Sequence, residues 1–309
     1  MTAGEGVAGG LLAAGLLLVT ACFAAGLDGA LAARSARGRW RSGLWSPAAE
    51  AARLLRQQRR STLAADTLLW RLGGAGLVVV PLLMIAVVPL GPHALFDSEV
   101  GVVWFNAADV LVWALVWLLG WGANSAWSLV GGYRFLAGAI AYELPLMFAL
   151  ATTGLAAASL RPSDIVVAQE RVWFVVWMPV AFAVMCLGVA GFSVWGPLSA
   201  AAAPDAAGGV LAELSGPDRL LVLVGRYLLL AAGSAAIVTL FLGGASGPLL
   251  PGWAWLLVKT VAMLAGLVLL RRRLPLLRPD RFLELGWLVL LPATLLQLLV
   301  VALVVLGRR

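Results

Sequence analysis

The stretch GWGANSAWSLVGGYRFLAGAIAYELP (residues 120–145) places two charged residues, Arg134 and Glu143, beside or inside an otherwise apolar segment. A carboxylate or guanidinium near the centre of a bilayer costs roughly 2.5 to 3.5 kcal/mol even on the most lenient insertion scale, so such groups usually face a helix bundle and have a partner or a function. The two residues lie nine positions apart, which is about 13 Å along a continuous helix. They cannot pair directly unless the helix breaks.

The composition around this stretch is that of a membrane protein. Of the 309 residues, 62% are hydrophobic and only 12% are charged, which excludes a soluble fold. Apolar runs of about 20 residues predict eight membrane-spanning helices and therefore an all-α bundle, over residues 7–32, 73–90, 99–121, 135–160, 173–195, 220–242, 252–270 and 283–306. The short connections leave no room for a second domain, so we expect one membrane domain over 1–309 with a long basic loop at 33–72.

Basic residues indicate how this bundle crosses the membrane. The loops after the first, third, fifth and seventh predicted helices hold sixteen arginines, and the opposite side holds four. The positive-inside rule then predicts a multi-pass protein of the bacterial plasma membrane with those four loops in the cytoplasm and both termini outside. Arg34 to Arg41 follow the first apolar run and no basic residue precedes it, which disfavours a cleaved signal peptide.

The basic loop contains a predicted helix of its own. Ser46 followed by Pro47 is typical of an N-cap and first helical residue, so we expect a helix from there to about Arg60. Within it, Glu50 and Arg53 have the i,i+3 spacing of an ion pair. The helix either lies at the membrane interface, with its arginines on lipid phosphates, or forms a docking surface for a peripheral partner.

The chain offers few residues for metal binding. The two cysteines, Cys22 and Cys186, lie in separate apolar runs, and the single histidine is His93. A metal or iron–sulfur site built by this chain alone is therefore not expected.

Several motifs of the chain resemble one known family. PLGPHALFDSEVGVVWF (89–105), GWGANSAWSLVGGYRFLAGAIAYELPL (120–146) and SDIVVAQ (163–169) are similar to stretches of the H subunits (NuoH family) of respiratory complex I, NADH-quinone oxidoreductase. The similarity continues in the family's order through ELSG (213–216), GRY (225–227), TLFLGGASGP (239–248), Lys259 and LPLLRPDRFLELGW (274–287). SPAAEAARLL (46–55) resembles the family's helix in the first loop. The resemblance covers about residues 46 to 306.

The resemblance implies a membrane subunit that joins a peripheral redox arm to a proton-pumping membrane arm. Its helices and cytoplasmic loops would form much of a quinone chamber. Quinone would be the substrate of the complex, reduced by iron–sulfur clusters in partner subunits, and this chain would bind no cofactor and would not be catalytic alone. The expected partners are the other membrane and peripheral subunits of a complex I-like assembly, the lipid bilayer and quinone, with no nucleic acid.

The loop between the fifth and sixth predicted helices departs from the family. The family has a run of carboxylates there, whereas this chain has GFSVWGPLSAAAAPDAAGGVLAELSG (191–216), with only Asp205 and Glu213 acidic. The family's acidic residue before the tyrosine of its sixth helix is Arg226 here. A proton path needs titratable groups or ordered water, and alanine supplies no titratable side chain. The departure favours an impaired proton relay.

Three carboxylates are the candidates for what relay remains: Glu143, Asp109 and Glu213. Glu143 matches the family's intramembrane glutamate, and its alternative role is a hydrogen bond to a carbonyl freed by Pro145. Asp109 has the alternative of a neutral carboxylic acid satisfied by a neighbouring helix. Arg226 and Lys259 are either counter-ions for these acids or side chains that extend to an interface.

A second set of residues is predicted to line the quinone chamber or to dock a partner. Within it, Arg278 and Asp280 resemble a family element and have a spacing at which an ion pair can rigidify a turn. The set is Glu50, Arg53, Arg134, Asp205, Arg278 and Asp280.

Three other functions stay open from the sequence. One is the equivalent membrane anchor of a membrane-bound hydrogenase, which uses no quinone, and another is a structural subunit that relays no protons. The third is a standalone carrier, which the lack of an inverted repeat or paired broken helices disfavours.

Overall fold

The computed structural model describes residues 3–90, 95–203 and 208–307, and every regular element in these residues is helical. Eight helical stretches among them are long and apolar enough to span a membrane. The predicted all-α bundle of eight spans is therefore confirmed. In chain order the elements are α1 (Ala3–Ser35), α2 (Trp40–Arg56), α3 (Thr67–Ile85), α4 (Gly101–Gly122), α5 (Ala126–Ala157), α6 (Pro162–Ala168), α7 (Phe174–Trp177), α8 (Pro179–Phe192), η1 (Gly196–Ala202), α9 (Gly216–Phe241), α10 (Gly252–Arg273), α11 (Pro279–Leu285), η2 (Gly286–Leu290) and α12 (Leu291–Leu306).

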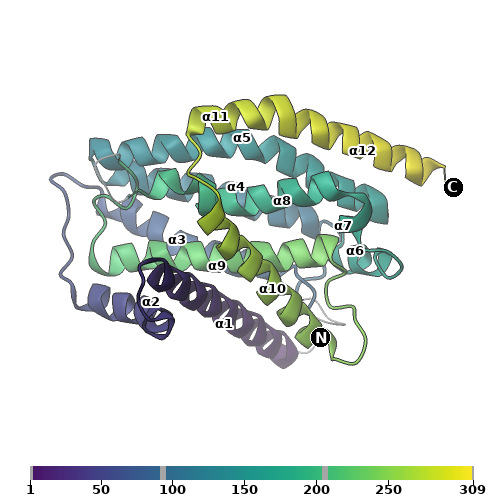
Figure 1. Cartoon of the computed structure of the whole chain (residues 1–309), viewed down its shortest axis with the longest axis horizontal. Coiled ribbons are helices and arrows are strands. Elements are labelled where there is room, and N and C mark those ends of the chain that lie inside the picture. The colour runs from purple at the N-terminus through teal and green to yellow at the C-terminus, as the bar shows by residue number, and fades with distance from the viewer. Residues whose placement is uncertain (1–2, 91–94, 204–207, 308–309) are drawn as a thin grey trace.

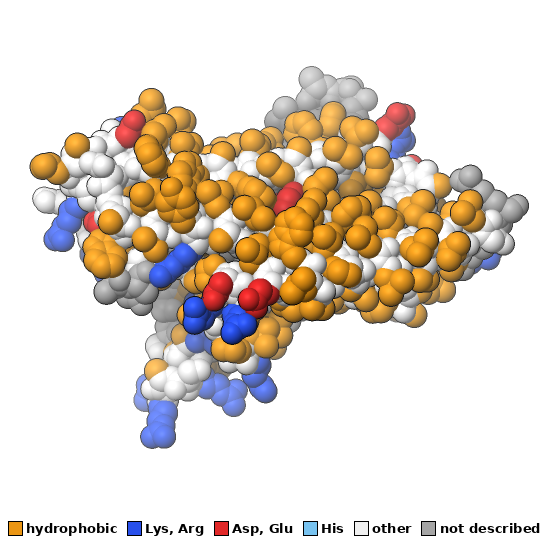
Figure 2. Space-filling view, turned by 90° about the horizontal axis from the view of Figure 1, so that it is seen from above, with side chains coloured by type: hydrophobic (Ala, Val, Ile, Leu, Met, Phe, Trp, Pro, Cys, Tyr) orange, Lys and Arg blue, Asp and Glu red, His pale blue; other side chains and the backbone are white. Residues whose placement is uncertain are grey.

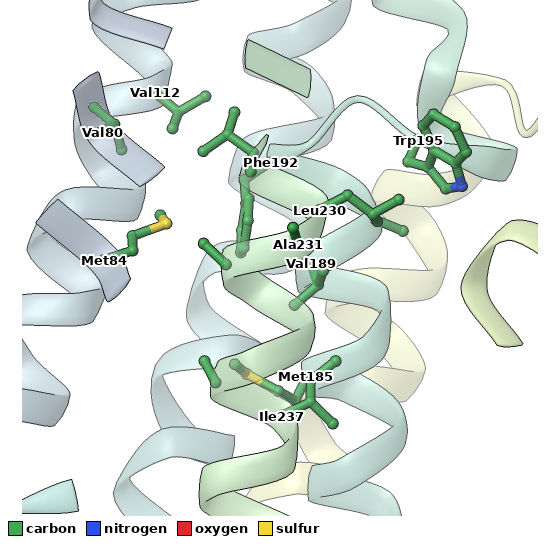
Figure 3. Packing of buried hydrophobic residues seen from close by; sticks show 14 of the residues in the cluster. Val80, Met84, Val112, Met185, Val189, Phe192, Trp195, Leu230, Ala231 and Ile237 are labelled. Carbon is green, nitrogen blue, oxygen red and sulfur yellow. The ribbon is translucent and has the colours of Figure 1, made fainter. Parts of the chain in front are cut away.

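Helix α9 lies at the centre of the bundle. It packs against α3 on one side, α8 on another, and α1 and α10 on a third (Figure 1). Small residues in its middle, from Ala231 to Ala236, let these neighbours approach closely. Figure 3 shows Leu230, Ala231 and Ile237 of α9 among side chains of the surrounding helices.

The bundle has two distinct ends. Helix α2 and the loop that leads to α3 lie at one end, and α6 and α7 lie at the other (Figure 1). Helix α1 begins and α12 finishes at the end that carries α6 and α7, as an even number of crossings requires. We call the end with α2 the basic end, because most of the chain's arginines fall in the predicted loops on that side of the bundle.

Helix α12 runs along the outside of α5. Leu296, Leu299 and Leu303 are exposed on it. Figure 2 shows hydrophobic side chains over much of the face seen from above. Such a surface suits lipid or another apolar subunit.

Two predicted spans are interrupted in the structure. The predicted helix 173–195 is divided into α7 and α8 at Pro179, whose ring nitrogen cannot donate to a preceding carbonyl. The predicted helix 283–306 begins earlier, at Pro279, and contains the π-helical turn η2 between α11 and α12. π-Helical turns of this kind often occur at functional sites.

Helix α3 begins six residues earlier than predicted, at Thr67. Errors at two further helix starts change how a residue is interpreted. Helix α5 begins at Ala126, so Arg134 lies inside a helix and not in a loop. Helix α2 begins at Trp40, which places Pro47 in its interior. Proline leaves the carbonyl of Gly43 without its helical donor, and the Ser46 hydroxyl donates to that carbonyl at 2.7 Å. Ser46 therefore satisfies the Gly43 carbonyl inside the helix and does not cap the start of the helix.

Candidate functional site

The candidate site is a pair of carboxyl groups between α4 and α5, which pack side by side. Asp109 lies eight residues from the start of α4 and Glu143 lies seventeen from the start of α5. At 1.5 Å per residue, these positions are about 12 Å and 26 Å into their helices. The structure thus brings two of the three predicted relay residues together near the middle of the bundle.

The carboxyl pair is buried and has few hydrogen-bond donors. Asp109 is fully buried, and Glu143 has 7% of its surface exposed. The two side chains lie within hydrogen-bonding reach of each other. The Asn106 amide donates to Glu143 Oε1 at 3.1 Å, but neither oxygen of Asp109 nor Oε2 of Glu143 has a donor in the part of the chain that the structure describes.

This geometry is unfavourable for two full negative charges. Adjacent like charges in an apolar surrounding repel each other strongly, and no arginine or lysine bonds to either group within the described residues. A proton on one carboxyl group would remove a charge and supply a hydrogen-bond donor for the other. The arrangement can therefore hold a proton.

A tyrosine and a tryptophan extend the polar cluster. Tyr142, with its hydroxyl, directly precedes Glu143 in α5. Trp113, with its indole nitrogen, follows Asp109 by one helical turn in α4. Both atoms are buried, and neither has a hydrogen-bond partner among the described residues. A cavity of about 20 Å³, large enough for about one water, is lined by Tyr142 and by Arg134, which lies two helical turns closer to the start of α5.

The alternative role predicted for Glu143 does not agree with the structure. Pro145 cannot donate to the carbonyl of Ala141, as expected, but Glu143 bonds to Asn106 instead of a freed carbonyl. The backbone of Ala141 lies against Gly286 of η2, where a side chain larger than hydrogen would collide with the Ala141 carbonyl. The π-helical turn therefore contacts α5 immediately before the tyrosine and glutamate of the cluster.

The third predicted relay residue, Glu213, lies elsewhere. Its carboxylate accepts a hydrogen bond from the Ser125 hydroxyl at 2.7 Å, at the N-cap of α5. Eighteen residues separate Ser125 from Glu143 in sequence, which is about 27 Å along the helix. Glu213 is therefore not part of the buried pair.

The loop between α8 and α9 also accounts for Arg134. Its guanidinium donates to the carbonyl of Gly208 at 2.6 Å, so it fixes this loop and does not pair with Glu143. This agrees with the spacing argument from the sequence. Asp205, predicted for the same region, lies outside the described residues, as does His93.

Neither predicted counter-ion reaches the acids. Arg226 donates to the carbonyls of Ser193 and Val194, at the C-terminus of α8, where the helix dipole favours a cation. Lys259 donates to the carbonyls of Leu242, Gly244 and Ser246 at 2.8 to 3.0 Å. Both cations are satisfied by backbone oxygens, so of the two roles left open for them the structure does not support the role of counter-ion to these acids.

Sequence reasoning missed a second buried carboxylate, Asp28 of α1. Arg271 and Arg272 of α10 donate to it at 2.6 and 2.8 Å, and the Tyr227 hydroxyl of α9 donates at 3.2 Å. We call these four residues the Asp28 cluster. An acid inside the first predicted span and two arginines directly after the seventh were the available signal.

The remaining candidates form exposed ion pairs. Arg53 binds both carboxylate oxygens of Glu50, at 2.6 and 2.7 Å, as the i,i+3 spacing predicted. This hydrogen bond and the positive charge of Arg53 hold the pKa of Glu50 below its usual value. Arg278 and Asp280 pair at 3.0 Å in the turn that begins α11. Both pairs are accessible to a partner.

These observations define a polytopic helical membrane protein with a buried pair of carboxyl groups in its interior. Comparison with known proteins is more specific. Residues 11–302 match the family model described as NADH dehydrogenase. The chain belongs to the family of the H subunits of NADH-quinone oxidoreductase.

Curated relatives agree over most of their length. The chain is 37% identical to NADH-quinone oxidoreductase H subunit 2 of Geobacter sulfurreducens over 272 residues, which cover 84% of this chain and 82% of the relative. It is 36% identical to H subunit 1 of Geobacter metallireducens over the same shares. The H subunit 2 of Syntrophobacter fumaroxidans is 34% identical over 84% of this chain and 81% of its own.

Proposed function

We propose that this chain is a membrane-arm subunit of a complex I-like NADH-quinone oxidoreductase. It links a peripheral redox arm to a proton-pumping arm and contributes helices and loops to the quinone chamber. The match over residues 11–302 and the eight spans support this role. Electrons reach quinone from iron–sulfur clusters of partner subunits, and the described residues contain no group of three histidines, cysteines or acids that could hold a metal.

The observation that carries the functional proposal is the Asp109–Glu143 pair. No cation neutralises these two buried carboxyl groups within the described residues, so in this proposal they share one proton. A conformational change that separated the two groups, or admitted water beside them, would release or rebind that proton. The pair is then a proton-holding site in the membrane interior, and Asn106 orients the Glu143 side of it.

The exposed pairs serve a different purpose in this proposal. Glu50 with Arg53, and Arg278 with Asp280, lie on elements that adjoin the basic end, where a peripheral arm would dock. The positive-inside rule assigns this end to the cytoplasm and both termini to the other side. Arg134 shapes the chamber by holding the loop at Gly208.

Copurification tests the assignment to a complex. Affinity-purified protein from its native host is expected to carry iron–sulfur subunits and antiporter-like membrane subunits. Isolation of the chain without either, from a host that expresses all of them, would contradict the assignment. The same preparation separates quinone reduction from hydrogen evolution, and so distinguishes the hydrogenase alternative.

Proton relay is tested by Glu143→Gln, with Glu170→Gln as the matched control. Glu170 is exposed in the segment after α6, so its substitution removes the same charge without touching the buried pair. We expect both variants to assemble, and only Glu143→Gln to lower proton translocation per electron. Unchanged pumping in a fully assembled Glu143→Gln complex would favour the structural role, which the alanine-rich loop and Arg226 also support.

A further inference from the structure

A cavity of about 130 Å³ opens at the basic end, between the loop after α2 and the first turns of α3 and α9. It is separate from the Asp109–Glu143 pair and from the exposed pairs already described. Its wall consists mainly of side chains that donate hydrogen bonds. The donors are Arg59, Arg60, Ser61, Thr67, Trp70 and Arg71.

The walls of this cavity are tied together across the fold. The backbone N–H of Arg60 donates to the Ser215 hydroxyl at 2.8 Å, and the N–H of Gly216 donates to the Gln57 side chain at 3.4 Å. These bonds join the loop after α2 to the start of α9. At the other wall, the N–H of Asp66 donates to the carbonyl of Gly122 at 2.8 Å. Hydrogen bonds therefore hold in place the backbone segments that carry these arginines.

The charges in the cavity do not balance. Three arginines line it against a single acid, Asp218, which lies 3.7 Å from Arg59. Arg60 and Arg71 have no ion pair within the described part of the chain. The cavity therefore carries two positive charges in excess.

The indole N–H of Trp70 is a further unsatisfied donor. Trp70 is only 4% exposed, and its nitrogen has no hydrogen-bond partner among the described residues. Asp218 Oδ1, in the same lining, is an acceptor that also has no partner among the described residues. The guanidinium groups, hydroxyls and indole N–H outnumber it, and together they suit a negatively charged ligand that mainly accepts hydrogen bonds. Arginine binds phosphate oxygens in this way, with two parallel N–H donors.

The position of the cavity indicates where such a phosphate comes from. It lies where the spans α3 and α9 begin, and Leu68 and Leu72 are exposed on α3 beside it. A ligand with its charged group in the cavity would have an apolar helix surface directly below. Basic pockets between membrane helices bind anionic lipid headgroups for the same reason. We propose that this cavity binds the phosphate group of an anionic phospholipid.

Native mass spectrometry of the purified complex in mild detergent tests the proposal, with phosphatidylglycerol as the probe and phosphatidylcholine as the zwitterionic comparison. We expect Arg60→Gln with Arg71→Gln to weaken phosphatidylglycerol binding at least about tenfold, because two charge-assisted contacts are lost. The matched control is Arg34→Gln with Arg39→Gln, two exposed arginines at the same end that do not line the cavity. It should change binding by less than about twofold.

Several results would overturn the proposal. Equal losses in both double variants would mean that only the general positive charge of this end attracts the lipid. Competition by inorganic phosphate as strong as by the lipid would assign the cavity to free phosphate. Lipid binding seen only after peripheral subunits are stripped away would assign it to an acidic partner surface. Arg60→Lys with Arg71→Lys guards against misfolding, since it keeps both charges and should retain most of the binding.

Discussion

Asp28 and Asp109 are both carboxyl groups buried among membrane helices, but their surroundings are opposite. Asp28 receives hydrogen bonds from two arginines and a tyrosine. Asp109 has no donor among the described residues, and its nearest titratable neighbour is another acid. One carboxyl group is therefore paired with two cations, while the other has no cation beside it among the described residues.

The difference distinguishes two roles of a carboxyl group whose burial among membrane helices costs free energy. The Asp28 cluster ties α1 to α9 and α10, so its charge contributes to the packing of three helices. The Asp109–Glu143 pair ties no helices together by charge and places two acids where apolar side chains would suffice. An intramembrane acid without a structural partner indicates function. The comparison predicts that substitutions at Asp28 impair stability, and that substitutions at Asp109 impair activity.

The largest effect is expected from Asp28→Ala. Removing the acid leaves Arg271 and Arg272 without their partner, and breaking a buried ion pair from one side typically costs 3 to 5 kcal/mol. The arginine side chains keep 34% and 31% of their surface exposed, so we expect the low end, about 3 kcal/mol of unfolding free energy. Thermal unfolding of the purified complex, or the amount of assembled complex in membranes, measures it.

Asp164→Ala is the control for this prediction. Asp164 is near a chain turn and bonds to the Ser159 hydroxyl without an arginine partner within the described residues. It should change stability far less. An Asp28→Ala complex that unfolds at the same temperature as the wild type would remove the contrast between the two acids.

Lys259 extends the comparison to a buried cation without an acid. Three backbone carbonyls surround its ammonium group, and the rings of Trp173 and Trp255 lie 4.8 and 5.8 Å away. Lys259→Met leaves the carbonyls without their donor, so we expect a loss of about 2 kcal/mol. Limited proteolysis of the 242–251 loop and thermal unfolding measure the change.

The matched variant at this site is Trp173→Leu. It removes one aromatic face and keeps the ammonium group, and so should cost at most about 1 kcal/mol. If Trp173→Leu were as harmful as Lys259→Met, ring packing and not the carbonyl contacts would hold the loop.

Asp109→Asn sharpens the other side of the comparison. Asparagine has nearly the shape of aspartic acid and can donate to Glu143, so the stability of the complex should change by less than about 1 kcal/mol. It cannot share a proton, so proton translocation should fall at least about tenfold. Acidification measured with a pH-sensitive dye in inverted membrane vesicles, beside the rate of NADH oxidation, tests both parts. A severe loss of assembly would place Asp109 with Asp28 as a structural acid.

The spans themselves could be predicted from the sequence, because apolar runs of membrane length have few alternatives. The residues at which helices begin were predicted less accurately than the spans. Arg134 was expected in a loop, yet residues 126–134 belong to α5. There Gly131 packs against the backbone of Gly209, and Arg134 donates to the carbonyl of Gly208. Pro47 suggested a helix start because proline is favoured at the first helical position. The sequence does not show that the Ser46 hydroxyl donates to the Gly43 carbonyl, which lets the helix continue through Pro47.

The site could be predicted residue by residue but not as an arrangement. Asp109 and Glu143 stand out as single acids in apolar runs, and their meeting depends on how α4 and α5 rotate against each other. Asn106 lies three residues before Asp109 and therefore on the same face of α4, which gave a weak signal. The roles of Arg226 and Lys259 stayed open because a sequence shows charges but not the backbone carbonyls that bind them. Asp28 was missed because its two arginine partners lie more than 240 positions away.

The smallest expected effect is a pH dependence at Glu50, where the ion pair is exposed and solvent weakens it. Because Arg53 lowers the pKa of Glu50 in the folded protein, the pair contributes stability above the unfolded pKa of about 4.3 and loses it as the pH falls through the lower folded value. Glu50→Gln should therefore unfold at a slightly lower temperature than the wild type at pH 7, and at the same temperature near pH 3. A difference in unfolding temperature that persists or grows at low pH would mean that Glu50 acts through something other than its charge. A large difference at pH 7 would show that this exposed pair stabilises the fold as strongly as the Asp28 cluster does, against what its exposure indicates.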